Sequence, residues 1–88
     1  MLTKRDRTAF HKRVEEIQRR RAANIRYAMA HAGGWDELGL VVGKSGAFLR
    51  QMAGDNPQRQ IGERLARQLE VELGLPLGWM DEKHAGVY

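Results

Sequence analysis

Hydrophobic residues recur at helical spacing along the first third of the chain. Between Thr8 and Ala32 there is neither glycine nor proline, so no residue type that breaks a helix is present. At 100° of rotation per residue the apolar positions share one face, which is interrupted by Arg21. These positions are Phe10, Val14, Ile17, Ile25, Ala28 and Ala32. The pattern predicts one long helix or two nearly continuous ones, ended by Gly33 and Gly34.

Two short helices separated by a glycine are predicted next. The first covers Trp35–Val42 and has two acids in its first turn, where the helix dipole favours negative charge. Gly43 ends it, and Ser45 is typical of an N-cap for a second helix over Ser45–Ala53. The positions expected to face inward are Leu38, Val42, Leu49 and Met52.

A further helix is predicted to begin between Pro57 and Ile61. Its apolar residues recur every four positions, at Ile61, Leu65, Leu69 and Leu73. Gly74 and Pro76 end it, and the segment Leu75–Asp81 is expected to fold back over the core, with fraying after Asp81. No alternating β pattern of useful length occurs, so the sequence predicts an all-α fold.

Composition supports one small globular domain. The chain has 88 residues, of which 42% are hydrophobic and 30% charged, and it contains no cysteine. The lack of cysteine excludes disulfides and thiolate chemistry and favours a reducing, cytoplasmic compartment. No apolar run approaches the roughly 20 residues of a membrane span, and the basic N-terminus is not followed by an apolar stretch as in a secretory signal.

Positive charge is concentrated at the N-terminus. The net charge is +4, but residues 1–26 hold nine Lys or Arg against three acids, a net of +6. The remaining residues hold six Lys or Arg against eight acids, a net of −2. Non-specific attraction to a polyanion would therefore come mainly from the N-terminal segment. A solvated basic helix face is the alternative explanation of this pattern.

The glycine-punctuated pair of short helices fits a helix-turn-helix. Gly39 allows close approach of the two helices, Gly43 allows a tight turn, and Leu49 lies six residues after that turn. A generic helical bundle with a glycine at this place is the alternative.

The run GKSGAFLRQMAGDNPQRQIGERLARQLEVELGLPLGWMD resembles the N-terminal DNA-binding domain of phage-repressor and Xre-type transcriptional regulators. The resemblance extends over residues 20–81. It implies a four- to five-helix repressor-like domain in which Trp35–Val42 positions the unit and Ser45–Ala53 is the recognition helix in the major groove. Residues 1–19 then form an added basic amphipathic helix, and residues 82–88 a frayed tail.

The resemblance places candidate base contacts on the recognition helix. Arg50 can contact guanine with two hydrogen bonds and Gln51 adenine, while Ala47 or Phe48 can touch a thymine methyl group. The full set of expected base-contact positions is Ser45, Gly46, Ala47, Phe48, Arg50 and Gln51. The apolar run Gly46-Ala47-Phe48 departs from the family pattern, since it leaves few hydrogen-bonding groups at the start of the helix.

Other polar residues suit phosphate contacts. In the loop and at the helix ends these are Lys44, Asn56, Gln58 and Arg59, and in the basic N-terminal segment Arg19, Arg20 and Arg21. The Phe10, Val14 and Ile17 spacing resembles a short coiled-coil seam, so a homodimer through these residues is expected. The added segment has three open roles: dimer helix, arm on the DNA backbone, or docking helix for another protein.

Enzymatic chemistry finds little support in the sequence. His11, His31 and His84 lack the spacing of a metal site, so no metal and no cofactor are expected. Gly43-Lys44-Ser45 does not complete a phosphate-binding P-loop, because Leu38 stands where its first glycine should be. Attachment of residues 4–21 to a membrane surface is disfavoured by a narrow apolar face without Trp.

These patterns predict a small, cytoplasmic and nucleoid-associated regulator, phage- or prophage-like, that binds double-stranded DNA in a sequence-specific way, as a repressor and without catalysis. The alternative is a protein-interaction module of the same fold, in which the Gly46-Ala47-Phe48 surface and the N-terminal helix bind another regulator or RNA polymerase.

Overall fold

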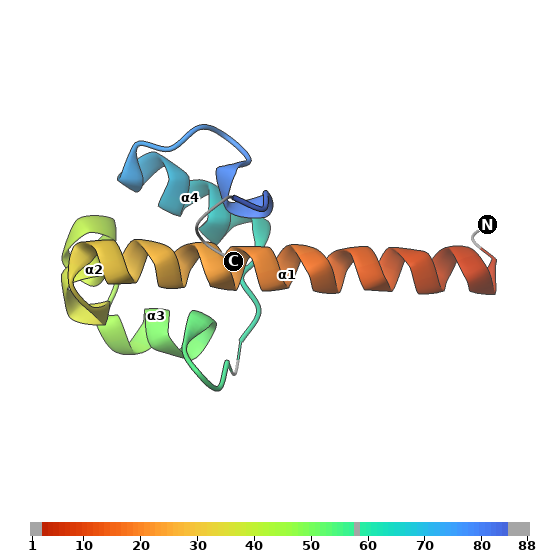
Figure 1. Cartoon of the computed structure of the whole chain (residues 1–88), viewed down its shortest axis with the longest axis horizontal. Helices are drawn as coiled ribbons and strands as arrows, with labels where there is room; N and C mark the ends of the chain where they lie inside the picture. Colours follow the sequence, from red (N-terminus) through yellow and green to blue (C-terminus); the bar gives the residue numbers. More distant parts are fainter. Residues whose placement is uncertain (1–2, 58, 85–88) are drawn as a thin grey trace.

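The computed structural model describes residues 3–57 and 59–84, which form four α-helices and one short 3-10 turn. The helices are α1 (Lys4–Ala32), α2 (Trp35–Val42), α3 (Gly46–Ala53) and α4 (Glu63–Leu73), and the turn is η1 (Trp79–Asp81). Figure 1 shows α1 as a long rod with the other helices gathered around its C-terminal half. No strand occurs among the described residues, and the predicted all-α, repressor-like class of fold is confirmed.

Helix α1 is a single helix that begins at Lys4, so of the two arrangements predicted for this region the one long helix is found. Thr3 caps it, because the Thr3 hydroxyl accepts from the Asp6 N–H at 3.1 Å and the Asp6 carboxylate accepts from the Thr3 N–H at 3.2 Å. Gly33, with φ of 100°, ends the helix in the left-handed conformation that glycine adopts without strain. The helix runs without a break across residues 19 and 20, where the sequence suggested a boundary.

The bounds of the two short helices agree with the sequence pattern, whereas α4 starts later than predicted. Ser45 is the N-cap of α3, as expected. Helix α4 begins at Glu63, after Gly62, so Ile61 lies ahead of the helix although its side chain is only 1% exposed. The Gln18 side-chain amide accepts from the Ile61 N–H and donates to the Ile61 carbonyl, both at 2.8 Å. These two hydrogen bonds attach the segment before α4 to α1.

The hydrophobic core lies between the C-terminal half of α1, the three shorter helices and η1. Its largest fully buried apolar side chains are Ile25, Leu38, Leu49, Ile61, Leu69 and Met80. Burial of each such side chain contributes about 1.5–3 kcal/mol relative to exposure. Met80 brings η1 into this core, which agrees with the expected folding back of Leu75–Asp81.

An ion-pair cluster around the buried Arg21 ties α1 to α4 and η1. Arg21 is 6% exposed and donates to the Asp81 carboxylate at 2.6 Å, the Glu63 carboxylate at 2.8 Å and the Ile61 carbonyl at 2.8 Å. The Arg67 Nη2 lies 2.9 Å from the Asp81 Oδ1, and the Arg67 Nε lies 3.1 Å from the Oε1 of the buried Glu70. The ion-pair cluster therefore consists of Arg21, Arg67, Glu63, Glu70 and Asp81.

The N-terminal half of α1 has no packing partner within the described chain. Every residue from Thr3 to Glu16 is exposed, and Phe10 retains 59% of its surface. We call Lys4–Glu16 the arm and the remaining described residues the body. In Figure 1 the arm extends well beyond the body.

The C-terminal end of the described chain is held more closely than expected. The rings of His84 and Trp79 are stacked with centroids 4.0 Å apart, and the His84 Nε2 lies 2.7 Å from the Trp79 carbonyl. The expected frayed tail, residues 82–88, stays a prediction, and residues 85–88 lie outside the described part. None of the described helices is long and apolar enough to cross a membrane.

Candidate nucleic-acid interface

Helices α2 and α3 pack tightly through their glycines. Gly43 has φ of 71° and its N–H donates to the Gly39 carbonyl at 2.9 Å, which closes α2 and turns the chain. A Cβ on Gly39 would collide with the Lys44 carbonyl oxygen and lie 3.3 Å from the Gly46 nitrogen. Because both obstacles are backbone atoms, the close approach requires glycine at position 39.

The outward face of α3 carries three of the predicted base-contact residues. Ala47, Arg50 and Gln51 are exposed and lie away from the buried Leu49 and Met52. Ser45 is also exposed, but its hydroxyl accepts from the Phe48 N–H at 3.1 Å and so serves as the helix cap. The structure thus gathers Arg50, Gln51 and Ala47 on one accessible surface.

Two other predicted base contacts are placed differently. Gly46 is buried, and a Cβ there would collide with the Asp36 carboxylate and lie 2.9 Å from the Asp36 nitrogen. Gly46 is therefore a close-packing position between α2 and α3, and its expected contact with bases is wrong. Phe48 is half-buried against the core, with the Lys44 Nζ 5.9 Å from its ring centroid.

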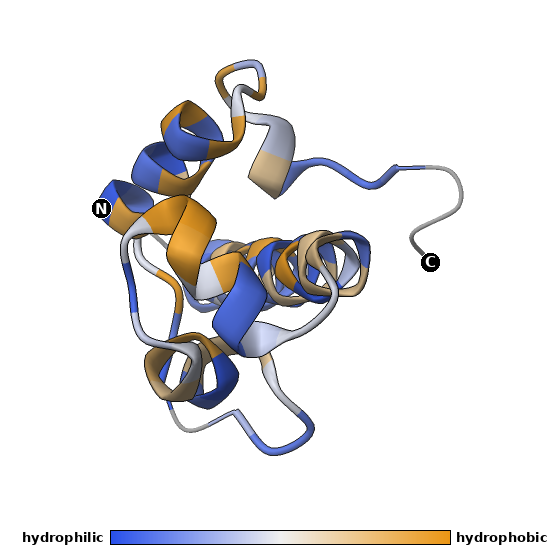
Figure 2. Ribbon diagram, turned by 90° about the vertical axis from the view of Figure 1, so that its left-hand side faces the viewer, coloured by the Kyte–Doolittle hydropathy of each residue, from blue (hydrophilic) through white to orange (hydrophobic). Residues whose placement is uncertain are grey.

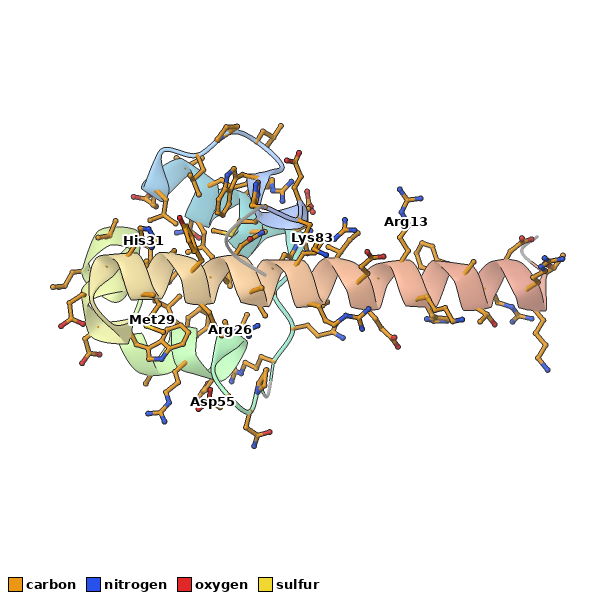
Figure 3. All side chains as sticks on the ribbon, viewed as in Figure 1. Arg13, Arg26, Met29, His31, Asp55 and Lys83 are labelled. Atoms are coloured by element: carbon orange, nitrogen blue, oxygen red, sulfur yellow. The ribbon has the colours of Figure 1, made fainter. Side chains whose placement is uncertain are left out.

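A groove of about 660 Å³ runs between the start of α2 and the outward face of α3. Arg50, Gln51 and Asn56 line it together with three carboxylates. The acids are Asp36, Glu37 and Asp55, and Asp55 lies at the far edge of the molecule below α3 in Figure 3. The acids bring negative charge beside the residues predicted to read bases, and sequence patterns did not reveal this proximity.

A second groove, of about 560 Å³, has a basic rim. It lies between α1 and the segment before α4, with an apolar floor that includes Ala22, Ala23 and Met52. Arg19, Arg26 and Arg59 line it. Arg26 is exposed and donates to the Ala53 carbonyl at the end of α3 at 3.2 Å. Sequence reasoning missed Arg26, although it lies seven residues after Arg19 and hence on the same helix face.

The predicted phosphate contacts separate into accessible and internal residues. Arg19, Asn56 and Arg59 are exposed, and Lys44 is half-buried. Arg20 pairs with Glu16 and is half-buried. The prediction that Arg21 contacts phosphate is wrong. Its guanidinium is buried and donates to Asp81, Glu63 and the Ile61 carbonyl, so it holds the fold together and does not face a ligand. Gln58 lies outside the described residues.

Electrostatics reinforce the internal role of Arg21. Its hydrogen bonds hold the pKa of the Asp81 carboxyl below the ordinary value, with a further contribution from Arg67. Asp81 in turn raises the pKa of Arg21. Among the described residues, no group of three or more His, Cys, Asp or Glu gathers in a way that could hold a metal ion.

Comparison with known proteins gives a distant similarity. The chain is 27% identical over 73 residues to the prophage repressor CohE of Escherichia coli strain K12. The matched stretch covers 83% of this chain but 31% of the repressor, so the chain spans less than a third of that protein. No protein-family model and no solved structure matches the chain.

Proposed function

We propose that this chain is a small, phage- or prophage-like regulator that binds double-stranded DNA in a sequence-specific manner through α2 and α3, used as a helix-turn-helix. The observation that carries the proposal is the outward face of α3, where Arg50 and Gln51 lie side by side and free of the core. The distant similarity to a prophage repressor supports the same role.

In this proposal α3 enters the major groove and its outward side chains read base edges. Arg50 donates two hydrogen bonds to guanine and Gln51 pairs with adenine, each contributing about 1–3 kcal/mol of discrimination. Ala47, which is small and exposed, contacts a thymine methyl group. Ser45 and Phe48 assist by capping and supporting the helix.

Basic and polar residues on either side of α2 and α3 attract the phosphates of the DNA in this proposal. Arg19, Arg26 and Arg59 on the basic groove, with Lys44 and Asn56 nearer α3, hold the DNA backbone and set the register of α3. The arm adds further cations. Binding of this kind would repress transcription in the cytoplasm by occupying the operator, without catalysis or a cofactor.

The test is fluorescence anisotropy with a random-sequence duplex and with a duplex selected from a random pool, in roughly 50 to 200 mM salt. The wild-type chain should prefer the selected duplex, and affinity should fall steeply with salt. Replacing both Arg50 and Gln51 by alanine should remove the preference, a loss of roughly 30- to 20,000-fold in the affinity ratio if the two contributions of about 1–3 kcal/mol add. Alanine at Arg64 and Gln68 is the matched control, since both are exposed on α4.

A second function is favoured by the three carboxylates around α3. Asp36, Glu37 and Asp55 would repel phosphates and would suit a basic protein partner. On this alternative α2 and α3 bind another regulator or RNA polymerase. Exposed apolar residues on α2, the mostly orange helix left of centre in Figure 2, agree with it: Leu40 is 87% and Val41 51% exposed. Failure of the folded chain to bind DNA even at low salt would overturn the DNA proposal and leave this one.

A further inference from the structure

Three arginines line the basic groove without a carboxylate partner among the described residues. They are Arg19 and Arg26 on α1 and Arg59 in the segment before α4. Arg26 donates to the Ala53 carbonyl at 3.2 Å, whereas Arg19 and Arg59 have no hydrogen bond or ion pair within the described structure. A guanidinium group has five N–H donors, so each of the three keeps donors for an occupant of the groove.

The charge around the groove is predominantly positive. None of the described residues that line it is acidic. Of the two acids about one turn before Arg19 on α1, Glu16 pairs with Arg20, and Glu15 is exposed. Asp55 lines the other groove, beside α2 and α3. We therefore expect the occupant of the basic groove to be negatively charged.

The floor of the groove is apolar. Ala22 and Ala23 lie between Arg19 and Arg26 along α1 and are 9% and 8% exposed, and Met52 of α3 adjoins them. Contact with a phosphate uses the guanidinium groups, whereas an apolar floor adds affinity only for an occupant with an apolar part. The phosphates of DNA therefore do not account for the floor.

The two arginines on α1 set a spacing for the anionic groups. Arg19 and Arg26 are seven residues apart, so they share a face of α1 and lie about 10 Å apart along its axis. In the polyproline II conformation, which is common in unfolded segments, residues three apart share a face and are about 9 Å apart. Two acids at that spacing can each reach one arginine, while a residue between them faces the floor.

We propose that the basic groove binds an acidic segment of another protein, in which two acids three residues apart flank apolar residues. The acids pair with Arg19 and Arg26, an apolar side chain lies on the alanine floor, and Arg59 adds positive charge from the other wall. Arginine clusters are a recurring means of binding acidic motifs. The spread of the cations favours such a segment over a small molecule with one anionic group, which would leave an arginine of α1 unused.

The bound segment would exclude the DNA backbone from the same side chains. Arg19, Arg26 and Arg59 are phosphate contacts in the function proposed above, so this competition rests on that function, whereas the docking itself does not. Arg26 also joins the groove to the end of α3, and Figure 3 shows it on the side of α1 toward that helix. The partner protein is therefore expected to release the chain from DNA.

Nuclear magnetic resonance titration of the isotope-labelled chain tests the docking without DNA. The probe is the peptide Gly-Glu-Leu-Leu-Glu-Gly with blocked ends. We expect the amide signals that shift to be those of the groove, among them Ala22, Ala23, Arg26 and Ile61, and not those of the arm. Replacing both leucines of the peptide by serine should weaken binding about tenfold or more, because the floor then loses its apolar contact.

Two double variants that remove the same charge locate the cations. Arg19→Gln with Arg59→Gln should weaken binding of the peptide roughly 5- to 30-fold. The matched control is Arg7→Gln with Arg13→Gln, which removes two exposed arginines from the arm and should change the affinity by less than about twofold. The spectrum of each free variant shows that it is folded. Equal weakening in the two variants would show attraction by net charge alone and overturn the proposal.

Other occupants of the groove give different results. A random-sequence duplex that shifts the same amides, with no shift from the peptide, would assign the groove to phosphates and overturn the proposal. Octanoate that shifts them, with no shift from the peptide, would assign the groove to a small amphiphile and overturn it as well. Equal affinity of the leucine and serine peptides would show that the floor is not used, with the same consequence.

Addition of the selected duplex separates the docking from the proposed function. We expect the duplex to displace the peptide, and a complex that holds both would overturn the competition. Peptide binding as expected together with no DNA binding would leave the docking standing and refute only the DNA function. Sequence-specific DNA binding with no shift from the peptide would do the reverse.

Discussion

The arm and the body are parts of one continuous helix in two different environments. On the body side Ile25 is 1% and Asn24 0% exposed, whereas on the arm Phe10 keeps 59% of its surface. The helical hydrogen bonding is the same in both. Because the backbone is the same and the burial of side chains differs, we expect the folding free energy to reside in the body, where side chains are buried.

Arg21 is the first buried residue of α1 on the body side, and removing it should have the largest effect. Arg21→Ala leaves the carboxylates of Asp81 and Glu63 without their buried partner. Asp81 keeps Arg67 and Glu63 is largely exposed, but the buried Ile61 carbonyl loses one of its two donors. Such a loss costs about 1–3 kcal/mol, so the body should unfold at a lower urea concentration. Urea unfolding followed by circular dichroism gives the free-energy difference.

Arg20→Ala is the control for this measurement. Arg20 is half-buried and pairs with Glu16 one turn away, an ion pair worth about 0–1 kcal/mol, and its contact with η1 is a long hydrogen bond of 3.4 Å to the Asp81 carbonyl. If the two substitutions cost the same, the ion-pair cluster would not be what holds α1 to η1 and α4.

A smaller effect on stability, from the pairing of Arg21 with Asp81, should be visible as the pH falls. Arg21 lowers the pKa of Asp81 from its ordinary value of 3.8. A depressed carboxyl pKa stabilises the fold above the unfolded-state value, and this contribution is lost as pH drops through the folded-state value. The body should therefore lose stability as the pH falls below about 4, and Asp81→Asn should flatten that part of the profile.

Asp6 is the comparison group in the arm. Thr3 lowers the pKa of Asp6 through the capping hydrogen bonds, but Asp6 is exposed and belongs to no packed region. Asp6→Asn should leave the acid part of the unfolding profile unchanged. A profile in Asp81→Asn identical to that of the wild type would show that the acid sensitivity arises elsewhere.

The sequence predicted α2 and α3 of the body well because residues that cap or end a helix stand at their ends. Gly43 after α2 and Ser45 before α3 act through their own backbone or the next few residues, so a pattern of neighbours is enough to place them. The predicted start of α4 was wrong because Ile61 has helical spacing, while Gln18, 43 residues away, holds its backbone before the helix.

The candidate site was predicted only in part, for the same reason. Arg50 and Gln51 follow from helical periodicity. Arg21 resembled a solvent-facing break in the apolar stripe, since its partners Glu63 and Asp81 lie 42 and 60 residues away and no local rule connects them. The burial of Gly46 likewise depends on Asp36 of another helix.

The smallest effect on stability is expected from weakening the arm itself. Lys12→Gly costs about 1 kcal/mol of local helix propensity, so at dilute, monomeric concentration the arm should fray and the helical circular dichroism should fall. Because the arm buries no side chain in the body, the urea midpoint should not move. Ala30→Gly is the matched control: it lies exposed on the same face of α1 within the body and should lower the stability by about 0.5–1 kcal/mol. Equal shifts of the midpoint in the two variants would show that arm and body unfold as one unit, and would remove the distinction between them.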